Sequence, residues 1–177
     1  VFDGRGYKPY QSEDAACPVS VYGQSKLDGE KAVLANAQIA VVIRTAWMYS
    51  PYGNNFVKTI RRFGAEKEQI NVVCDQIGTP TSAADLAAAI VQILPQMSEA
   101  NKGIYHFTDE GVCSWYDFAQ EIIAQSGLEC KVLPIASEAY PSKAKRPFYS
   151  VLDKSKIKRT FNLTIPYWKE SLAKCLK

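Results

Sequence analysis

The run of residues from Ile39 to Trp47 constrains the fold more than any other segment. It is continuous, apolar and rich in β-branched residues, and it directly follows a stretch of good helix formers that ends near Asn36. Such a run after a helix is typical of a parallel strand that is buried on both faces. The pattern therefore predicts an α/β protein with a mostly parallel sheet.

Predicted strands and helices alternate along the rest of the chain, without internal repeats or low-complexity segments. Capping and periodicity predict helices at 20–36, 56–63, 83–94, 115–126, 154–161 and 167–177. They predict strands at 39–47, 70–74, 103–107 and 131–135, an edge strand at 150–153 and a loop at 136–147. A doubly wound sheet needs several buried strands. We expect the missing ones upstream of Val1, and expect the chain to be the C-terminal piece of a longer protein.

Composition limits the classes of function. The chain is 47% hydrophobic and 22% charged, with a net charge of +3, which is ordinary for a globular protein. Its one dense basic run, 154–159, is interpreted as a solvated helix face, so no nucleic-acid partner is expected. No apolar run is long enough to cross a membrane, so no membrane partner is expected either.

The cysteines and the single histidine argue against a metal site. The five cysteines are scattered and contain no C-x-x-C pair, which fits unpaired thiols in a reducing cytoplasm. His106 lies inside the predicted strand 103–107 and is interpreted as structural. No metal-binding residues are predicted.

Tyr22 and Lys26 carry the clearest chemistry in the sequence. They are four residues apart in a predicted helix, so their side chains lie on one face about one turn apart. A nearby ammonium favours the charged form of a phenol, which suits a tyrosine that acts as a general acid or base. The alternative is an ordinary packing tyrosine, because the same spacing arises by chance in many helices.

The residues around this pair form a longer pattern. It comprises Val1-Phe-Asp-Gly4, Pro18-x-x-x-Tyr22-Gly-x-Ser-Lys26-x-x-Gly-Glu30, Arg44-Thr-Ala-Trp47-x-Tyr49, Gly53-Asn-Asn-Phe-Val57, Asp75-Gln-x-Gly-x-Pro-Thr81 and Arg146-Pro-x-x-Ser-x-Leu-Asp153. The first two segments resemble extended short-chain dehydrogenase/reductases. Together, in this order, the segments resemble the dTDP-4-dehydrorhamnose reductase family over nearly the whole chain.

The resemblance implies a fold and a division into domains. It implies the C-terminal part of a Rossmann-like doubly wound sheet plus a smaller α/β substrate-binding domain. Residues 1–50 would be the last part of the Rossmann-like domain, with the Tyr-x-x-x-Lys helix and a buried strand. Residues 51–177 would be mainly the substrate-binding domain, with segments that return to the sheet.

The resemblance also implies an activity, the NAD(P)H-dependent reduction of the C4 keto group of dTDP-4-dehydro-L-rhamnose to dTDP-L-rhamnose. Tyr22 would protonate the C4 oxygen as hydride arrives from NADPH or NADH. Lys26 would bind the nicotinamide ribose and tune the tyrosine, so both residues would also contact the cofactor. The dTDP-sugar is the expected partner, and since some family members are homodimers, a second copy of the chain is another.

Four further residues are candidates for substrate binding. Trp47 ends the predicted buried strand, where open α/β sheets bind ligands, although a core aromatic is the alternative. Asn54 or Asn55 would contact the nucleotide sugar, or else cap the following helix. Arg146 has five fixed donors suited to a phosphate oxygen, or it is a surface arginine. The segment 75–81 is interpreted as a structural turn.

Several expected parts of such an enzyme are not found in this sequence. The family's glycine-rich dinucleotide fingerprint does not occur in it, and the carbonyl-binding Ser or Thr is expected upstream of Val1. We therefore expect the chain to be inactive alone, with the choice between NAD and NADP and the exact sugar left open. A non-catalytic regulatory subunit of this fold, as in a methionine adenosyltransferase, and a sister epimerase or dehydratase are the alternative functions.

Overall fold

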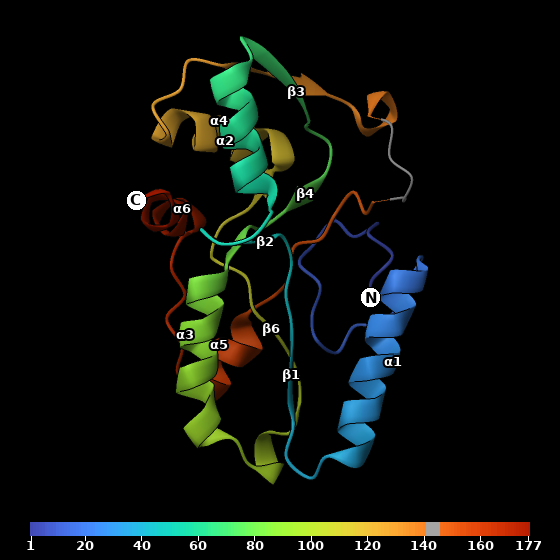
Figure 1. Ribbon diagram of the computed structural model, residues 1–177. Helices are drawn as coiled ribbons and strands as arrows, with labels where there is room; N and C mark the ends of the chain where they lie inside the picture. Colours follow the sequence, from blue (N-terminus) through green and yellow to red (C-terminus); the bar gives the residue numbers. More distant parts are fainter. Residues whose placement is uncertain (141–145) are drawn as a thin grey trace.

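One part of the molecule is built on a parallel pair of strands. The computed structural model describes residues 1–140 and 146–177. In it, β1 (Val41–Arg44) pairs in parallel with β6 (Gly103–His106). Figure 1 shows α1 (Val21–Asn36) on one side of this pair, and α3 (Ala83–Ile93) and α5 (Ser155–Phe161) on the other. Apolar residues of α3, α5 and β6 form one hydrophobic core, which includes Ile93, Tyr105, Phe107, Ile157 and Phe161.

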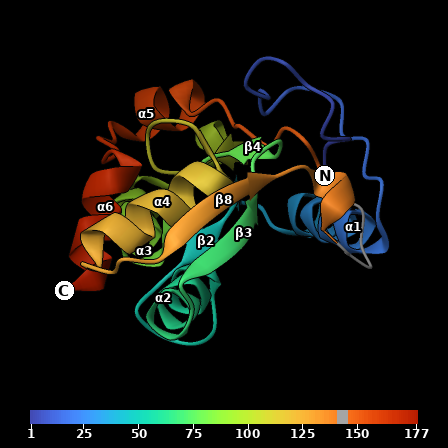
Figure 2. The same cartoon turned by 90° about the horizontal axis from the view of Figure 1, so that it is seen from above.

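A second parallel pair organises the other part. Strand β3 (Gln69–Val73) pairs with β8 (Lys131–Ile135), and Figure 2 shows the two side by side. Helices α2 (Phe56–Glu66) and α4 (Trp115–Gln125) pack against the strands and each other. Burial alternates over the first four residues of β3, as expected for a strand with one face in a core. This larger core includes Val57, Ile60, Val72, Phe118 and Ile122.

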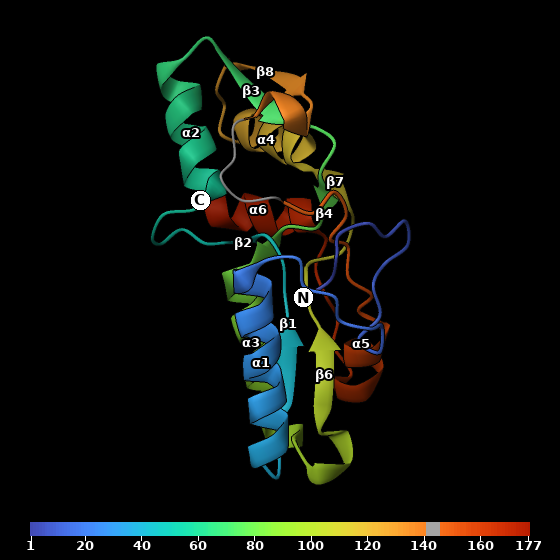
Figure 3. The same ribbon diagram turned by 90° about the vertical axis from the view of Figure 1, so that its right-hand side faces the viewer.

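Short elements join the two parts, as Figure 3 shows. Strand β2 (Met48–Tyr49) pairs in parallel with β5 (Thr81–Ser82), and β4 (Ile77–Gly78) pairs antiparallel with β7 (Cys113–Ser114). Helix α6 (Trp168–Leu176) contacts both β5 and α4. Three single-turn 3₁₀ helices complete the described elements: η1 (Leu94–Gln96), η2 (Glu99–Asn101) and η3 (Ser137–Ala139).

Most predicted elements are present, with ends that differ by a few residues, and the fold is a mixed α/β fold with small parallel sheets. Three expectations need correction. The strand predicted at 39–47 is shorter, and its residues are half-buried because β1 has one partner strand among the described residues. The edge strand at 150–153 is replaced by isolated bridges, Tyr10 to Leu152 and Ile77 to Tyr149. The loop at 136–147 contains η3, and positions 141–145 lie outside the described residues.

Two larger expectations stay predictions. One is the division at residue 50 into a Rossmann-like and a substrate-binding domain. The other is the doubly wound sheet, since the described strands form four two-stranded sheets. Among the described helices, none has both the length and the apolar character needed to cross a membrane.

Candidate functional site

Tyr22 and Lys26 lie in the first turns of α1. The helix starts there because the Ser20 side chain caps it, accepting a hydrogen bond from the Gly23 amide at 3.1 Å. The Nζ atom of Lys26 lies 5.4 Å from the centroid of the Tyr22 ring. Tyr22 is 72% exposed. The pair therefore has the predicted geometry, and its phenol is open to an incoming molecule.

The start of α1 and the carboxyl end of β1 lie at the same end of their part of the molecule, next to the other part (Figures 1 and 3). Glu30 of α1 and Arg44 of β1 join the two elements. Arg44 Nε donates to Glu30 Oε1 at 2.9 Å, and Nη2 donates to Oε2 at 2.7 Å. This contact ties the helix that carries Tyr22 to the strand that leads to Trp47.

Trp47 adopts an unusual backbone conformation just after β1. Its φ is 49°, in the left-handed region that few residues other than glycine adopt. Its indole stacks on that of Trp115, with ring centroids 3.6 Å apart and planes at 12°. Gly78 lies directly against the indole: a Cβ there would sit 2.6 Å from the Trp47 ring, so only glycine fits without displacement.

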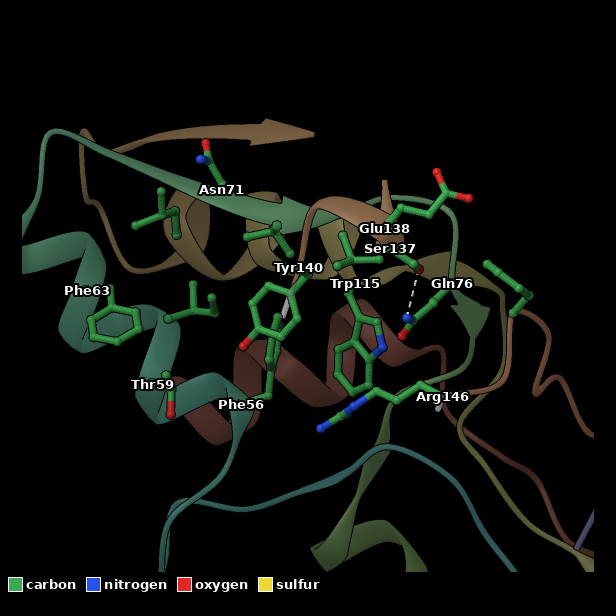
Figure 4. A pocket seen from close by; sticks show the side chains of 15 residues that line it. Phe56, Thr59, Phe63, Asn71, Gln76, Trp115, Ser137, Glu138, Tyr140 and Arg146 are labelled. Carbon is green, nitrogen blue, oxygen red and sulfur yellow. Dashed lines mark hydrogen bonds between the residues drawn. The ribbon is translucent and has the colours of Figure 1, made fainter. Parts of the chain in front are cut away.

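A large cavity in the described part of the chain has a volume of about 840 Å³. Figure 4 shows Trp115, Gln76 and Arg146 around it. Its walls come from α2, β3, the start of α4 and the segment around η3. The lining residues include Phe56, Thr59, Phe63, Val72, Gln76, Trp115, Ser137, Tyr140, Arg146 and Phe148.

A small polar network holds one wall of the cavity. The Asp75 carboxylate accepts from the Ser137 amide at 2.9 Å and from the Ser137 hydroxyl at 2.6 Å. Gln76 Nε2 donates to the same hydroxyl at 2.9 Å. Burial opposes ionisation of Asp75, but the hydrogen bonds from Ser137 outweigh it and lower the pKa of the carboxyl group. The network fixes η3 against the end of β3, so Asp75 has a structural role.

Asn55 is the N-cap of α2. Its Oδ1 accepts from the Lys58 amide at 3.2 Å, while its Nδ2 donates to the Ser50 carbonyl at 2.7 Å. The capping alternative therefore describes Asn55 in this structure. Asn54 is exposed. Neither asparagine is among the residues that line the large cavity.

The structure brings together only some of the predicted site residues. Arg146 lines the large cavity. Trp47 does not line it, but stacks on Trp115, which does. Tyr22 and Lys26 line neither this cavity nor a smaller one of about 130 Å³ beside Arg44. Sequence reasoning missed the aromatic walls of the large cavity, Phe56, Phe63, Trp115 and Tyr140, because no local pattern links residues of three separate segments.

Two buried titratable groups lie at the end of β6 and just after it. Asp109 is fully buried, and burial raises its pKa to about 7 although the Ser82 amide donates to it at 3.0 Å. His106, also buried, has its pKa lowered to about 4 by burial and by the charge of Arg44. Among the described residues, no group of three or more His, Cys, Asp or Glu side chains could hold a metal ion.

Comparison with known proteins places these features in a family. The family model described as the RmlD substrate binding domain matches residues 1–177. A dTDP-4-dehydrorhamnose reductase from Sinorhizobium fredii is 41% identical over 179 residues, which cover 97% of this chain and 60% of that protein. The chain spans about three-fifths of the length of the curated relatives that it matches.

Solved structures agree with the match in sequence. A dTDP-4-dehydrorhamnose reductase from Clostridium acetobutylicum has a TM-score of 0.92 at 42% identity, over 99% of this chain and 61% of that chain. The Bacillus anthracis reductase, solved in complex with NADP, has a TM-score of 0.91 at 37% identity over the same shares, 99% and 61%. The chain therefore belongs to the dTDP-4-dehydrorhamnose reductase (RmlD) family.

Proposed function

We propose that this chain is the substrate-binding part of an NAD(P)H-dependent reductase. In the complete protein the reaction would be the reduction of the C4 keto group of dTDP-4-dehydro-L-rhamnose to dTDP-L-rhamnose. The support comes from relatives that bear this enzyme's name at about 40% identity and from a relative solved with NADP. The single observation that carries the proposal is the exposed Tyr22 phenol with Lys26 above its ring.

Tyr22 is proposed as the proton donor. The nicotinamide cofactor, when bound, supplies the hydride for C4 of the sugar. The Tyr22 hydroxyl gives its proton to the C4 oxygen, so that the carbonyl becomes an alcohol. The Lys26 ammonium favours the charged tyrosine that this transfer leaves behind, and its remaining donors suit the ribose hydroxyls of the cofactor.

The described residues fit one end of the cofactor. The exposed start of α1, with the small exposed residue Ser25 between Tyr22 and Lys26, leaves room for a nicotinamide ribose. No glycine-rich turn that opens a helix after a strand occurs in this sequence to hold the pyrophosphate. We therefore propose that residues 1–177 alone bind NADPH weakly and do not turn over. Normal rates of NADPH oxidation by the purified chain would refute this.

The large cavity is the proposed site for the nucleotide part of the substrate. Its volume of about 840 Å³ lies within the usual range for a small-molecule site. Aromatic walls suit a flat base, and the guanidinium of Arg146 suits a diphosphate oxygen. Trp47 would support this wall through Trp115, and Asn54 or Asn55 would contact the sugar nucleotide from the loop before α2.

Replacement of Tyr22 by phenylalanine in the full-length protein tests the reductase assignment. We expect kcat to fall by about 10²–10⁴-fold, with the KM for the dTDP-sugar retained, because the hydroxyl acts in proton transfer rather than in binding. Tyr7→Phe is the matched control, since Tyr7 is 90% exposed and lies outside the site. An unchanged rate for Tyr22→Phe would disprove the assignment of Tyr22 as the proton donor.

Arg146→Lys in the same protein tests the nucleotide site. Lysine keeps the charge but loses the planar fork of donors. We expect a higher KM for the dTDP-sugar at nearly constant kcat. A fall in kcat at constant KM would contradict a binding role for Arg146.

Two features of the cellular setting are also proposals. All five cysteines are free, which is in keeping with a reducing cytoplasm.

A homodimer is the proposed assembly, because such dimers occur in the family. Light scattering of the full-length protein at catalytic concentrations would decide between dimer and monomer.

A further inference from the structure

Glu30 and Arg44 form a buried ion pair with two points of contact. The two N–H···O bonds, of 2.9 and 2.7 Å, run side by side from one guanidinium to one carboxylate. Only 8% of the Arg44 side chain and 9% of the Glu30 side chain are exposed. Such a paired contact fixes orientation as well as distance. The ring of Phe2 lies 5.0 Å from Arg44 Cζ and packs against the guanidinium.

Helix α1 has few other anchors. Gly23 is its one buried residue, while Tyr22 is 72% and Val33 is 48% exposed. The remaining described side-chain hydrogen bonds of α1 stay within the helix or its N-cap. Within residues 1–140 and 146–177, therefore, the Glu30–Arg44 contact is the side-chain hydrogen bond that joins α1 to a strand. Half-buried apolar contacts tolerate sliding and rotation, whereas a two-point ion pair does not.

The anchor lies on the same side of α1 as the reacting residues. Tyr22, Lys26 and Glu30 follow one another at intervals of four, so their side chains share one side of the helix. Glu30 lies about 12 Å along the axis from Tyr22. An error of about 10° in the rotation of α1 would displace an atom at the helix surface by about 1 Å. A displacement of that size can reduce an enzyme's rate by about 100-fold.

We propose that Glu30 and Arg44 are positioning residues, which set the rotation and height of α1 on β1 and thereby place the Tyr22 hydroxyl for proton transfer. The proposal rests on the reductase function proposed above. Neither residue needs to touch the substrate or the cofactor. A buried ion pair adds little net stability but can specify one register, and here the register belongs to the helix that carries Tyr22 and Lys26.

Glu30→Gln in the full-length protein is the first test. Glutamine keeps the shape of the side chain but removes its charge and one of the two acceptors. We expect kcat to fall by about 10–100-fold with little change in the KM for the dTDP-sugar. The matched control is Asp28→Asn. Asp28 is an exposed carboxylate on the same helix, bonded only to Gln24 at 2.8 Å among the described residues, and its removal should leave kcat unchanged.

A second variant tests the positioning role even if Glu30→Gln fails to fold. Glu30→Leu with Arg44→Met replaces the ion pair by an apolar pair and leaves no buried charge unpaired, a change that proteins commonly tolerate. Circular dichroism should show a native spectrum at the assay temperature. Its kcat should nevertheless be reduced, because apolar contacts do not set the rotation of α1. Wild-type kcat in this folded variant would overturn the positioning role.

A double-mutant cycle separates positioning from a general structural role. If Glu30 acts through Tyr22, Glu30→Gln should cost little further rate in the Tyr22→Phe background. A loss of equal size in both backgrounds would overturn the proposal. The outcomes also separate the positioning role from the reductase assignment. An unchanged rate for Tyr22→Phe removes the reductase assignment, whereas a slow Tyr22→Phe with unaffected Glu30 variants removes only the positioning role.

Discussion

The indole of Trp47 lies flat on the indole of Trp115, with centroids 3.6 Å apart. Trp47 follows β1, and Trp115 is the first residue of α4. Trp115 lines the large cavity and Trp47 does not. The stack therefore connects the carboxyl end of β1, next to which α1 begins, to the wall of the proposed nucleotide site.

Stacked indoles couple optically, so the pair can be detected in solution. We expect an exciton couplet in the far-ultraviolet circular dichroism spectrum, and expect Trp47→Phe and Trp115→Phe each to abolish it. Each variant should also lose about 1 kcal/mol of stability, the usual contribution of an aromatic pair. Trp168→Phe is the control, because Trp168 packs on Phe118 rather than on another indole. A couplet that survived in Trp115→Phe would contradict the stacked geometry.

The two adjacent asparagines should behave differently on replacement by alanine. Asn55→Ala removes the cap of α2 and the bond to the Ser50 carbonyl, so we expect a loss of about 1–2 kcal/mol in the free energy of unfolding. Asn54→Ala should be nearly neutral because Asn54 is exposed. Urea unfolding measures both. A raised KM for the dTDP-sugar in Asn54→Ala alone would assign the substrate contact to Asn54.

Asp109 should make the protein less stable as the pH rises. Burial raises the pKa of Asp109 to about 7 from its ordinary value of 3.8, with a contribution from the nearby Asp85, while the Ser82 amide and Lys154 oppose the shift. The folded state therefore binds the proton more tightly than the unfolded state. The stabilisation is complete below the ordinary pKa and is lost as the pH rises through 7.

Asp109→Asn mimics the protonated acid and should remove this dependence. At pH 8 we expect the variant to be more stable than the wild type by up to a few kcal/mol. The difference should shrink toward pH 4. Thermal or urea unfolding across this range measures it, and a variant that was less stable than the wild type at pH 8 would show that the buried carboxylate is stabilised in its charged form.

His106 should make the protein less stable as the pH falls. Burial, and then the charge of Arg44, lowers its pKa to about 4 from 6.5. Its contribution to stability is fully present above pH 6.5 and is lost as the pH falls toward 4. His106 is the single histidine of the chain, so in the isolated chain its ring signals in a proton NMR spectrum are unambiguous. They should titrate near pH 4, and a midpoint near 6.5 would disprove the buried neutral state.

Local sequence was sufficient for most of the helices. The Ser20 cap and the helix formers that follow predict α1 to within a residue, and Ser82 and Ser114 cap α3 and α4 where the pattern places their starts. Helix ends depend on residues within one turn, which a sequence displays directly. The two-residue strands β2, β4, β5 and β7 were missed, because two residues cannot show a period.

The sequence by itself determined the alternation of helices and strands, the family and the pairing of Tyr22 with Lys26, because each depends on neighbouring residues or on an ordered set of short segments. Only the tertiary structure decided that Glu30 locks α1 to Arg44, that Trp47 stacks on Trp115, and that four segments enclose one cavity. These contacts join residues that are distant in the chain. From the sequence alone, many residues could pair with the same charge or stack on the same aromatic ring, and only the packing of the strands shows which residue does so.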